Sequence, residues 1–143
     1  MTVSEHIHDM TAKWKRAQPA RADVIQRLAA EVGLELPQDY LVFLGYSNGG
    51  EGELGVEPGW FQIWPAEQVV ELNESYAIKE FLPGFFGFGS SGGGELLAFD
   101  TRAGVPWPVV MVPFDCLQPN LAKPVAPDFG KLIQHLGRPV SST

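Results

Sequence analysis

The spacing of apolar residues changes its period at Asn48-Gly49-Gly50, and this change limits the folds open to the chain. Before this turn-forming sequence, apolar residues recur every three or four positions, as they do on one face of a helix. After it, short apolar runs are separated by glycine and proline, which is typical of strands. Helices followed by a run of strands do not give the regular alternation of a parallel doubly wound sheet. The pattern therefore predicts an α+β fold with a mainly antiparallel central sheet and flanking helices.

Three helices are expected near the N-terminus, at about residues 3–17, 20–32 and 37–47. In each of them the apolar residues fall on one face at the helical period. Gly33 suits the end of the second helix, because glycine adopts the left-handed cap conformation at little cost. Pro37 suits the first turn of the third helix, where its missing amide proton is not needed.

A sheet region is expected over about residues 52–113, with an inserted helix at about 66–76. The short apolar runs that predict its strands lie near residues 54–56, 60–64, 85–88, 95–100 and 109–112. A closing helix is predicted at about 128–136, with Asp128 as its N-cap and Gly137 at its end.

The size and composition of the chain predict one folded domain over residues 1–143. A chain of 143 residues is long enough for one ordinary domain and too short for two. Its 45% hydrophobic content is far from that of disordered chains. The single cysteine, Cys116, cannot form a disulfide within the chain, and charged residues interrupt the N-terminal segment, so no signal peptide or membrane span is expected. We therefore expect a cytoplasmic protein.

Acidic residues are concentrated in the middle of the sequence. The formal net charge is -7, which argues against direct binding of nucleic acid. Residues 37–100 contain ten acidic residues and a single basic one, Lys79. General solubility does not require such a concentration, although an acidic excess is common in soluble proteins. The distribution favours a surface that meets a basic partner.

The inserted helix at residues 66–76 is the most informative acidic segment. At about 100° per residue, one side of this helix carries three glutamates: Glu67, Glu71 and Glu74. The opposite side is apolar: Val69, Leu72 and Tyr76. Like charges four residues apart cost about 0.2–0.5 kcal/mol per pair, and no lysine or arginine relieves them here. The acidic face is therefore predicted to bind a partner.

Four further residues are candidates for the same contact. Glu51, Glu53 and Glu57 precede the acidic helix and are expected to extend its surface. Trp107 lies between two prolines, which favour a turn or a sheet edge, and an exposed tryptophan is a common anchor of protein interfaces.

The glycine-rich segment resembles two catalytic motifs, and its context supports neither. Residues 87–92 match the G-x-G-x-x-G pattern, but a strand is expected to follow, so no helix N-terminus is available for a phosphate. Ser91 also lies in a formal G-x-S-x-G pattern with His135 downstream, although His135 falls in the closing helix. A hairpin loop is the favoured reading, and a serine hydrolase using Ser91 and His135 is a remote alternative.

No cofactor or metal is expected. His6 and His8 would point to opposite sides of a helix, so they cannot hold one ion. Cys116 stands among apolar residues with no histidine nearby in the sequence, which is typical of an inert thiol.

Three segments together resemble the SUKH superfamily, which groups bacterial toxin-immunity proteins with fungal regulators of cell-wall synthesis (Smi/Knr-type). Residues 36–44 (LPQDYLVFL), followed by Asn48-Gly49-Gly50, are similar to its N-terminal signature. Residues 88–100 resemble its glycine-rich hairpin, and residues 108–114 resemble the strand that follows. Members often carry an acidic residue in this hairpin where the chain has Ser90-Ser91, so no partner contact is carried over from that loop.

The resemblance implies an α+β fold, no catalysis and, for bacterial members, neutralisation of a cognate toxin. Many such toxins are nucleases, whose basic surfaces suit an acidic partner. The expected function is therefore that of an immunity protein that binds a basic toxin domain, with no direct contact to nucleic acid or membrane. The alternative is an intracellular scaffold or regulator that binds other proteins.

Overall fold

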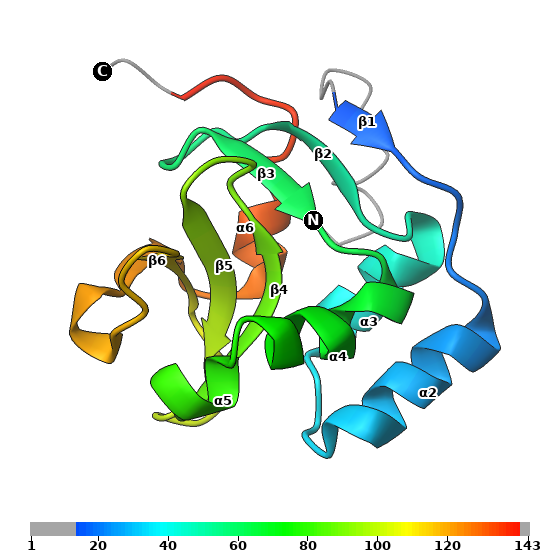
Figure 1. The fold of residues 1–143 in the computed structure, drawn as a ribbon. Helices are drawn as coiled ribbons and strands as arrows, with labels where there is room; N and C mark the ends of the chain where they lie inside the picture. Colours follow the sequence, from blue (N-terminus) through cyan, green and yellow to red (C-terminus); the bar gives the residue numbers. More distant parts are fainter. Residues whose placement is uncertain (1–13, 141–143) are drawn as a thin grey trace.

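The computed structural model describes residues 14–140, which form a sheet with helices on both faces (Figure 1). The strands are β1 (Trp14–Arg16), β2 (Gly50–Glu53), β3 (Trp60–Ile63), β4 (Phe85–Ser90), β5 (Glu95–Asp100), β6 (Val109–Pro113) and β7 (Lys123–Ala126). The helices are α2 (Ala22–Val32), α3 (Gln38–Tyr46), α4 (Ala66–Ser75), α5 (Ile78–Phe81), the short 3-10 helix η1 (Pro119–Leu121) and α6 (Phe129–Ile133). The α+β class predicted from the sequence is confirmed.

The strands of residues 14–140 form one seven-stranded sheet, in which each strand pairs antiparallel with the next along the chain. Antiparallel neighbours can be joined by short connections, so this order needs no crossover through the sheet. The α4–α5 segment is inserted between β3 and β4. Its helices therefore begin at one sheet strand and end at the next, which fixes them against the sheet at both ends.

One face of the sheet carries an aromatic core beneath α3 and α6. Tyr40 of α3 and Phe129 of α6 pack against Phe88 and Phe99 of the central strands, and Phe43 of α3 packs against Phe129. The ring centroids of Phe88 and Phe99 lie 4.6 Å apart, and those of Tyr40 and Phe129 lie 5.4 Å apart. The Tyr40 hydroxyl has no hydrogen-bond partner among the described residues, and burial raises the pKa of Tyr40. This core holds the central strands in place.

The other face of the central strands is covered by α4 and α5. Val69 of α4 and Ile78 of α5 are buried there. Trp64, Tyr76 and Phe114 form an aromatic stack at the end of α4, with centroid distances of 6.2 Å and 4.7 Å. Helix α2 packs beside α4 rather than on the sheet, as Figure 1 shows. Two neighbouring helices therefore border the same outer surface.

The expected first helix at residues 3–17 is wrong at its C-terminal end. Residues 14–16 form β1, which pairs with β2, and residues 3–13 lie outside the described part of the chain. The ring of Trp14 lies 5.7 Å from that of Phe43 and 5.9 Å from that of Phe61. Partial burial of this indole against the core, together with pairing to β2, favours a strand over the helix that the apolar spacing predicted.

The other predicted helices are confirmed, with shifted ends. The second predicted helix is α2, and Gly33 after it has the left-handed φ of 71°. The third is α3, the inserted helix is α4, and the closing helix is the shorter α6. Asp128 caps α6, because its side chain accepts a hydrogen bond from the Lys131 amide at 2.8 Å. Helix α5 has no counterpart among the predicted elements.

The strand boundaries differ from the sequence expectation at three places. The second strand of the sheet is β2 (Gly50–Glu53), and Leu54 just after it forms only an isolated bridge to Leu136. Strand β4 extends through Ser90, with a bulge between Gly87 and Gly89. The edge strand β7 was not predicted.

Candidate functional site

Two asparagines fix the position of α4. At its N-terminus, Asn48 accepts a hydrogen bond from the Ala66 amide at 2.7 Å and donates one to Glu67 at 2.7 Å. Pro65, at the N-cap position, has no side chain that can make this bond, so Asn48 supplies the cap from the preceding turn. Near the other end, Asn73 donates to the Gly87 carbonyl and accepts from the Gly87 amide, both at 2.8 Å. The orientation of α4 on the sheet is therefore set at both ends.

The orientation of α4 gives it an acidic outer face and a buried inner face. Val69 is fully buried and Leu72 is half-buried, as the helical spacing predicted. Tyr76, just beyond the helix, is more exposed than expected. All three glutamates predicted on the outer face are exposed: Glu67, Glu71 and Glu74.

The exposed glutamates of α4 are not neutralised by ion pairs in the described part of the chain. The ion pairs among residues 14–140 join Arg21 to Asp23 and Arg102 to Asp100. Arg27 of α2 lines a small hollow together with Glu67, but the two form no ion pair within 4.0 Å. The carboxylates of α4 therefore remain open to water and to an incoming cation.

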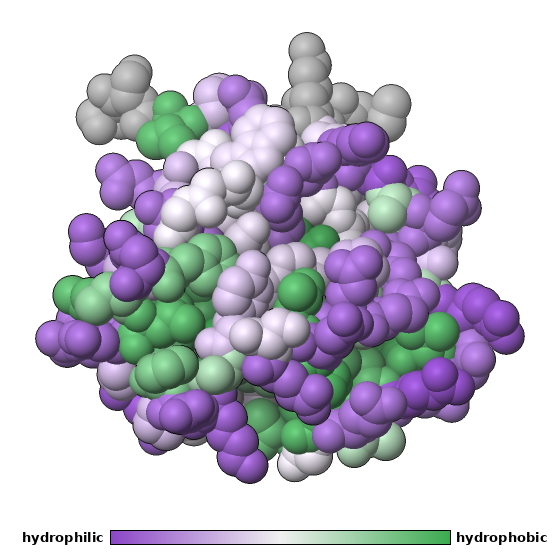
Figure 2. Space-filling model, in the orientation of Figure 1, coloured by the Kyte–Doolittle hydropathy of each residue, from purple (hydrophilic) through white to green (hydrophobic). Residues whose placement is uncertain are grey.

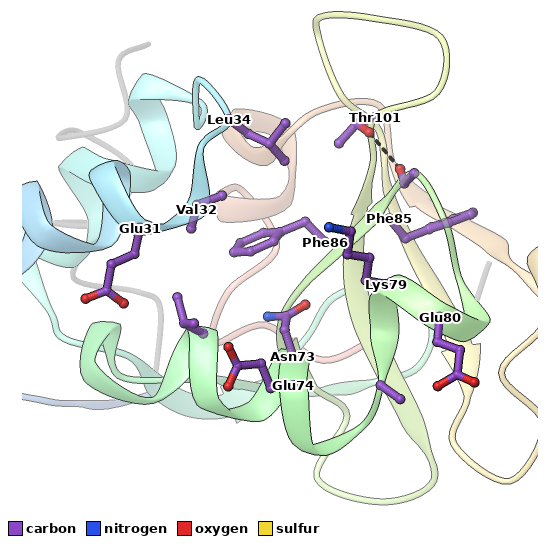
Figure 3. Close-up of a pocket in the computed structure, with 13 residues that line it drawn as sticks. Glu31, Val32, Leu34, Asn73, Glu74, Lys79, Glu80, Phe85, Phe86 and Thr101 are labelled. Carbon is purple, nitrogen blue, oxygen red and sulfur yellow. Dashed lines mark hydrogen bonds between the residues drawn. The ribbon is translucent and has the colours of Figure 1, made fainter.

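A larger hollow opens where α2, α4, α5 and the start of β4 meet. It has a volume of about 660 Å³. Its apolar lining comprises Val32, Leu34, Val70, Ala77, Phe85 and Phe86. The charged residues beside it are Glu31, Glu74, Lys79 and Glu80, as Figure 3 shows. Figure 2 shows apolar surface between α4 and α2 with hydrophilic residues on both sides. We call the α4 glutamates together with Glu31 the α4 surface.

The other predicted glutamates lie on a separate part of the molecule. We call Glu51, Glu53 and Glu57 the β2 surface, because the first two belong to β2 and the third to the turn after it. Figure 1 shows β2 and its turn to β3 at the top of the molecule, with α4 crossing below. The Glu51 carboxylate accepts a hydrogen bond from Gln62 at 3.1 Å, and Lys15 is its Cα partner on β1. The β2 surface therefore includes its own basic neighbour.

The prediction that Trp107 is exposed is wrong. Only 8% of this residue is accessible, and its ring lies 5.9 Å from that of Phe99. The Asp100 amide donates a hydrogen bond to the Pro108 carbonyl at 3.0 Å, which extends the pairing of the central strands up to this proline. Because Pro108 is tied to the centre of the sheet, Trp107 packs into the core and is not an interface anchor.

The glycine-rich segment forms a β-hairpin, as the favoured reading predicted. Strand β5 follows it, so no helix N-terminus faces the turn. The Ser91 hydroxyl donates to the Glu95 carboxylate at 2.7 Å and accepts from the amides of Gly93 and Glu95. No histidine is among the hydrogen-bond partners of Ser91 in residues 14–140. The hydroxyl therefore stabilises the hairpin, and among residues 14–140 it lacks the histidine partner that the G-x-S-x-G motif requires.

The remaining residues considered for chemistry are His135, Cys116, His6 and His8. Burial and the nearby Arg138 lower the pKa of His135, which lies beside Gly55. Cys116 is half-buried and unpaired, and His6 and His8 lie outside the described residues. In residues 14–140, no three His, Cys, Asp or Glu side chains are placed to hold a metal ion. No helix in this part of the chain is long and apolar enough to cross a membrane.

Comparison with known families agrees with this architecture. The model of the SMI1 / KNR4 family (SUKH-1) matches residues 19–135, which is most of the chain. The chain belongs to this SUKH-1 family. Membership supports a toxin-immunity or regulator-type protein, and SUKH-1 proteins are generally non-catalytic. A search of curated proteins found no match.

The fold of this SUKH-1 protein brings together residues that sequence reasoning did not connect. Glu31 of α2 was not among the predicted site residues, although it lies beside the hollow with Glu74 of α4. One signal was available in the sequence. Glu31 precedes the last residue of α2, and acidic residues are disfavoured in the last turn of a helix. Because the negative charge of Glu31 lies at the negative end of the helix dipole, it does not stabilise α2, and Glu31 is therefore a candidate for binding.

Proposed function

We propose that this SUKH-1 protein is a non-catalytic immunity protein that binds and neutralises a cognate bacterial toxin domain. The observation that carries the proposal is the row of exposed α4 glutamates, which no described lysine or arginine neutralises. The partner is a basic protein domain, such as a nuclease, whose cationic substrate channel complements these carboxylates. Covering that channel blocks the toxin without any chemistry on the part of this protein.

The α4 surface is proposed as the principal contact and the β2 surface as a second, weaker one. The α4 glutamates stand on a helix that Asn48 and Asn73 hold in place, so their charges are arranged before the partner arrives. Prearranged charges accelerate association and fix the orientation of the complex. On the β2 surface, Lys15 opposite Glu51 reduces the attraction for a cationic partner. A cytoplasmic location is part of this proposal, since an immunity protein of this kind meets its toxin inside the cell.

The experiment that tests the proposal is co-expression with the toxin domain encoded by the neighbouring gene. Cells that make the toxin should survive with the wild-type protein and die with the triple variant Glu67→Lys, Glu71→Lys and Glu74→Lys. For a matched control, Glu71→Lys alone is compared with Asp115→Lys, which makes the same charge change at an exposed site outside both acidic surfaces. Circular dichroism checks that every variant is folded.

Three outcomes separate the possibilities. Death with the wild-type protein rejects the immunity role for that pair. Survival with the folded triple variant rejects the α4 surface as the contact. If no toxin domain is encoded beside this gene and the chain instead co-purifies with proteins of its own cell, the scaffold or regulator alternative takes the place of the immunity role.

A further inference from the structure

The hollow beside the α4 surface offers a bound partner apolar contact as well as charge. Its walls are apolar, and the two phenylalanines at its base, Phe85 and Phe86, are mostly buried. Leu34, on its wall, is 42% exposed, and Phe81 on the adjoining α5 is 52% exposed. Apolar surface therefore continues from the hollow onto the rim. Burying such surface stabilises a complex in rough proportion to the apolar area removed from water.

The uncharged polar groups of the hollow are already hydrogen-bonded within the protein. Asn73 is bonded to the carbonyl of Val69 and to both backbone groups of Gly87. The hydroxyl of Thr101 donates to the Gly84 carbonyl at 2.7 Å. These groups need no bond from an occupant, so specific recognition falls to the apolar walls and to the charged residues at the rim.

The mainly negative charges at the rim favour a cationic occupant. Glu31 and Glu74 each precede the last residue of their helix, α2 and α4, and Figure 3 shows their side chains at the hollow, one from each helix. Neither helix carries a basic residue in its last turn. The C-terminal ends of the two helices add partial negative charge at the same place. Glu80 also borders the hollow, and Lys79 is the basic residue of its lining.

The size of the hollow suits side chains of a peptide segment. A volume of about 660 Å³ lies within the ~300–1,000 Å³ typical of ligand sites, and it accommodates more than one side chain. The exposed Leu34 offers further apolar contact to a chain that runs past the opening, and Phe81 on α5 adds an exposed ring next in sequence to Glu80 of the lining. A carboxylate or phosphate would face the negative rim, which excludes acidic occupants by repulsion.

We infer that this hollow binds a segment of the partner that presents apolar side chains next to lysine or arginine. The apolar side chains fill the space between Val32, Val70 and Phe86, and the basic groups reach Glu31 and Glu74. The inference deepens the proposed function, because it gives the chemistry of the segment that the partner inserts. It rests on the proposed function only for the identity of that partner.

The test uses the full-length protein and random displayed peptides of about twelve residues, a length sufficient for one helix or one extended segment. Selection on the wild-type protein is followed by removal of peptides that also bind the Leu34→Asp variant. Since Leu34 is exposed, its replacement should cost little stability. The selected peptides should carry Leu, Ile, Phe or Met within three positions of Arg or Lys.

Fluorescence anisotropy then measures the affinity of one selected peptide for matched variants. Glu31→Lys with Glu74→Lys should weaken binding by roughly tenfold or more, since two attractive charges become repulsive. Glu53→Lys with Glu57→Lys makes the same change in net charge on the β2 surface and should change the affinity by less than about twofold. Replacing the apolar residues of the peptide by serine should abolish binding.

The outcomes are decisive in either direction. If selection yields no peptide that depends on Leu34, or yields acidic peptides, the inference is wrong. An equal loss of peptide affinity in both double variants would show that overall charge, and not the hollow, determines binding. That result would also overturn the inference. Since no toxin is used here, failure of this test leaves the survival experiment standing, and failure of the survival experiment leaves peptide binding to the hollow unaffected.

Discussion

The α4 surface and the β2 surface contain similar numbers of glutamates but differ in what surrounds them. Beside the α4 surface lies an apolar hollow of about 660 Å³, and on neither surface is a carboxylate held by an ion pair among residues 14–140. On the β2 surface, Glu51 is hydrogen-bonded to Gln62, and Lys15 lies opposite it on the neighbouring strand. A hollow of about 600 Å³ also borders the β2 surface; its apolar lining is smaller and comes from Trp14 and Trp60, of which Trp60 is 40% accessible. Charge alone therefore does not distinguish the two surfaces.

The difference lies in what each surface can add after the first encounter. Long-range attraction depends on net charge, and both surfaces contribute to it. A lasting complex also needs apolar contact in a desolvated site, which the hollow provides. Under the proposed function, we therefore expect short-range binding mainly on the α4 side, whose hollow has the larger apolar lining, and a steering role for the β2 side.

The largest expected difference between the surfaces is in the rate of association with the toxin domain. Glu67→Lys, Glu71→Lys and Glu74→Lys together should slow association by roughly tenfold or more at low ionic strength, because they reverse the local field at the contact. The matched variant Glu51→Lys, Glu53→Lys and Glu57→Lys should slow it by about threefold or less. Stopped-flow fluorescence at two salt concentrations measures both rates, and the difference should shrink at high salt.

Equal slowing by the two triple variants would contradict the assignment of binding to α4. A slower rate that does not respond to salt would also contradict it, since screening acts on every exposed charge.

A second prediction concerns Gly89, which joins the part of the sheet under α4 to the part that carries β2. A Cβ added at Gly89 would lie 2.5 Å from the Gln62 carbonyl oxygen. Gly89→Ala should therefore force β3 away from β4 and lower the free energy of unfolding by about 3 kcal/mol. Gly94→Ala is the matched control, because no heavy atom lies within 4 Å of an added Cβ there. Urea unfolding measures both, and equal stabilities would show that the strand contact is looser than described.

Local signals in the sequence predicted several of the helices. Gly33 ends α2, Asp128 caps α6, and the spacing of Val69 and the three glutamates gave α4 its two faces. Each of these signals acts within one or two helical turns, so the sequence of the segment contains it. The acidic face of α4 is the part of the candidate site that could be predicted.

The rest depends on contacts between distant residues. The spacing of apolar residues around Trp14 suits a helix, but pairing with β2 and packing on Phe43 and Phe61 favour a strand. Strand β7 contains Pro124, which weakens the strand signal and is tolerated at the sheet edge. The hollow unites residues from 31 to 101, and the packing of α2 against α4, and of α4 and α5 against β4, brings them together.

A smaller effect is expected from Ala77, which lines the hollow at the end of α4. Its φ of 53° is left-handed, a conformation that costs a non-glycine residue about 1 kcal/mol. Ala77→Gly should therefore raise the free energy of unfolding by up to about 1 kcal/mol. The control Ser75→Gly, still inside α4, should lower it by about 0.5–1 kcal/mol. Thermal unfolding distinguishes the two signs, and a loss of stability in both variants would contradict a strained Ala77.

The smallest effect expected is a pH dependence confined to the β2 side. Residues 14–140 contain one histidine, His135. Its backbone carbonyl accepts a hydrogen bond from the amide of Gly55, two residues after β2. Burial and Arg138 lower the pKa of His135 below 6.5, so the unfolded chain binds a proton more readily than the folded one. The free energy of unfolding should therefore fall as the pH drops below about 6.5. The His135→Gln variant should lose less stability over the same pH range.

The effect of His135 on stability and the effect of the carboxylates fall in different pH ranges, so they can be measured separately. Arg102 lowers the pKa of Asp100, so the stability from that pair is lost only at more acidic pH, and unfolding measured between pH 7.5 and 5.5 leaves it in place. Over this range, the protection of amides from exchange, relative to the intrinsic exchange rate at each pH, should fall at residues 54–57, next to His135, and stay unchanged along α4. An equal fall in protection in both places would mean that acid weakens the whole sheet, and the two surfaces would then not be independent parts of the molecule.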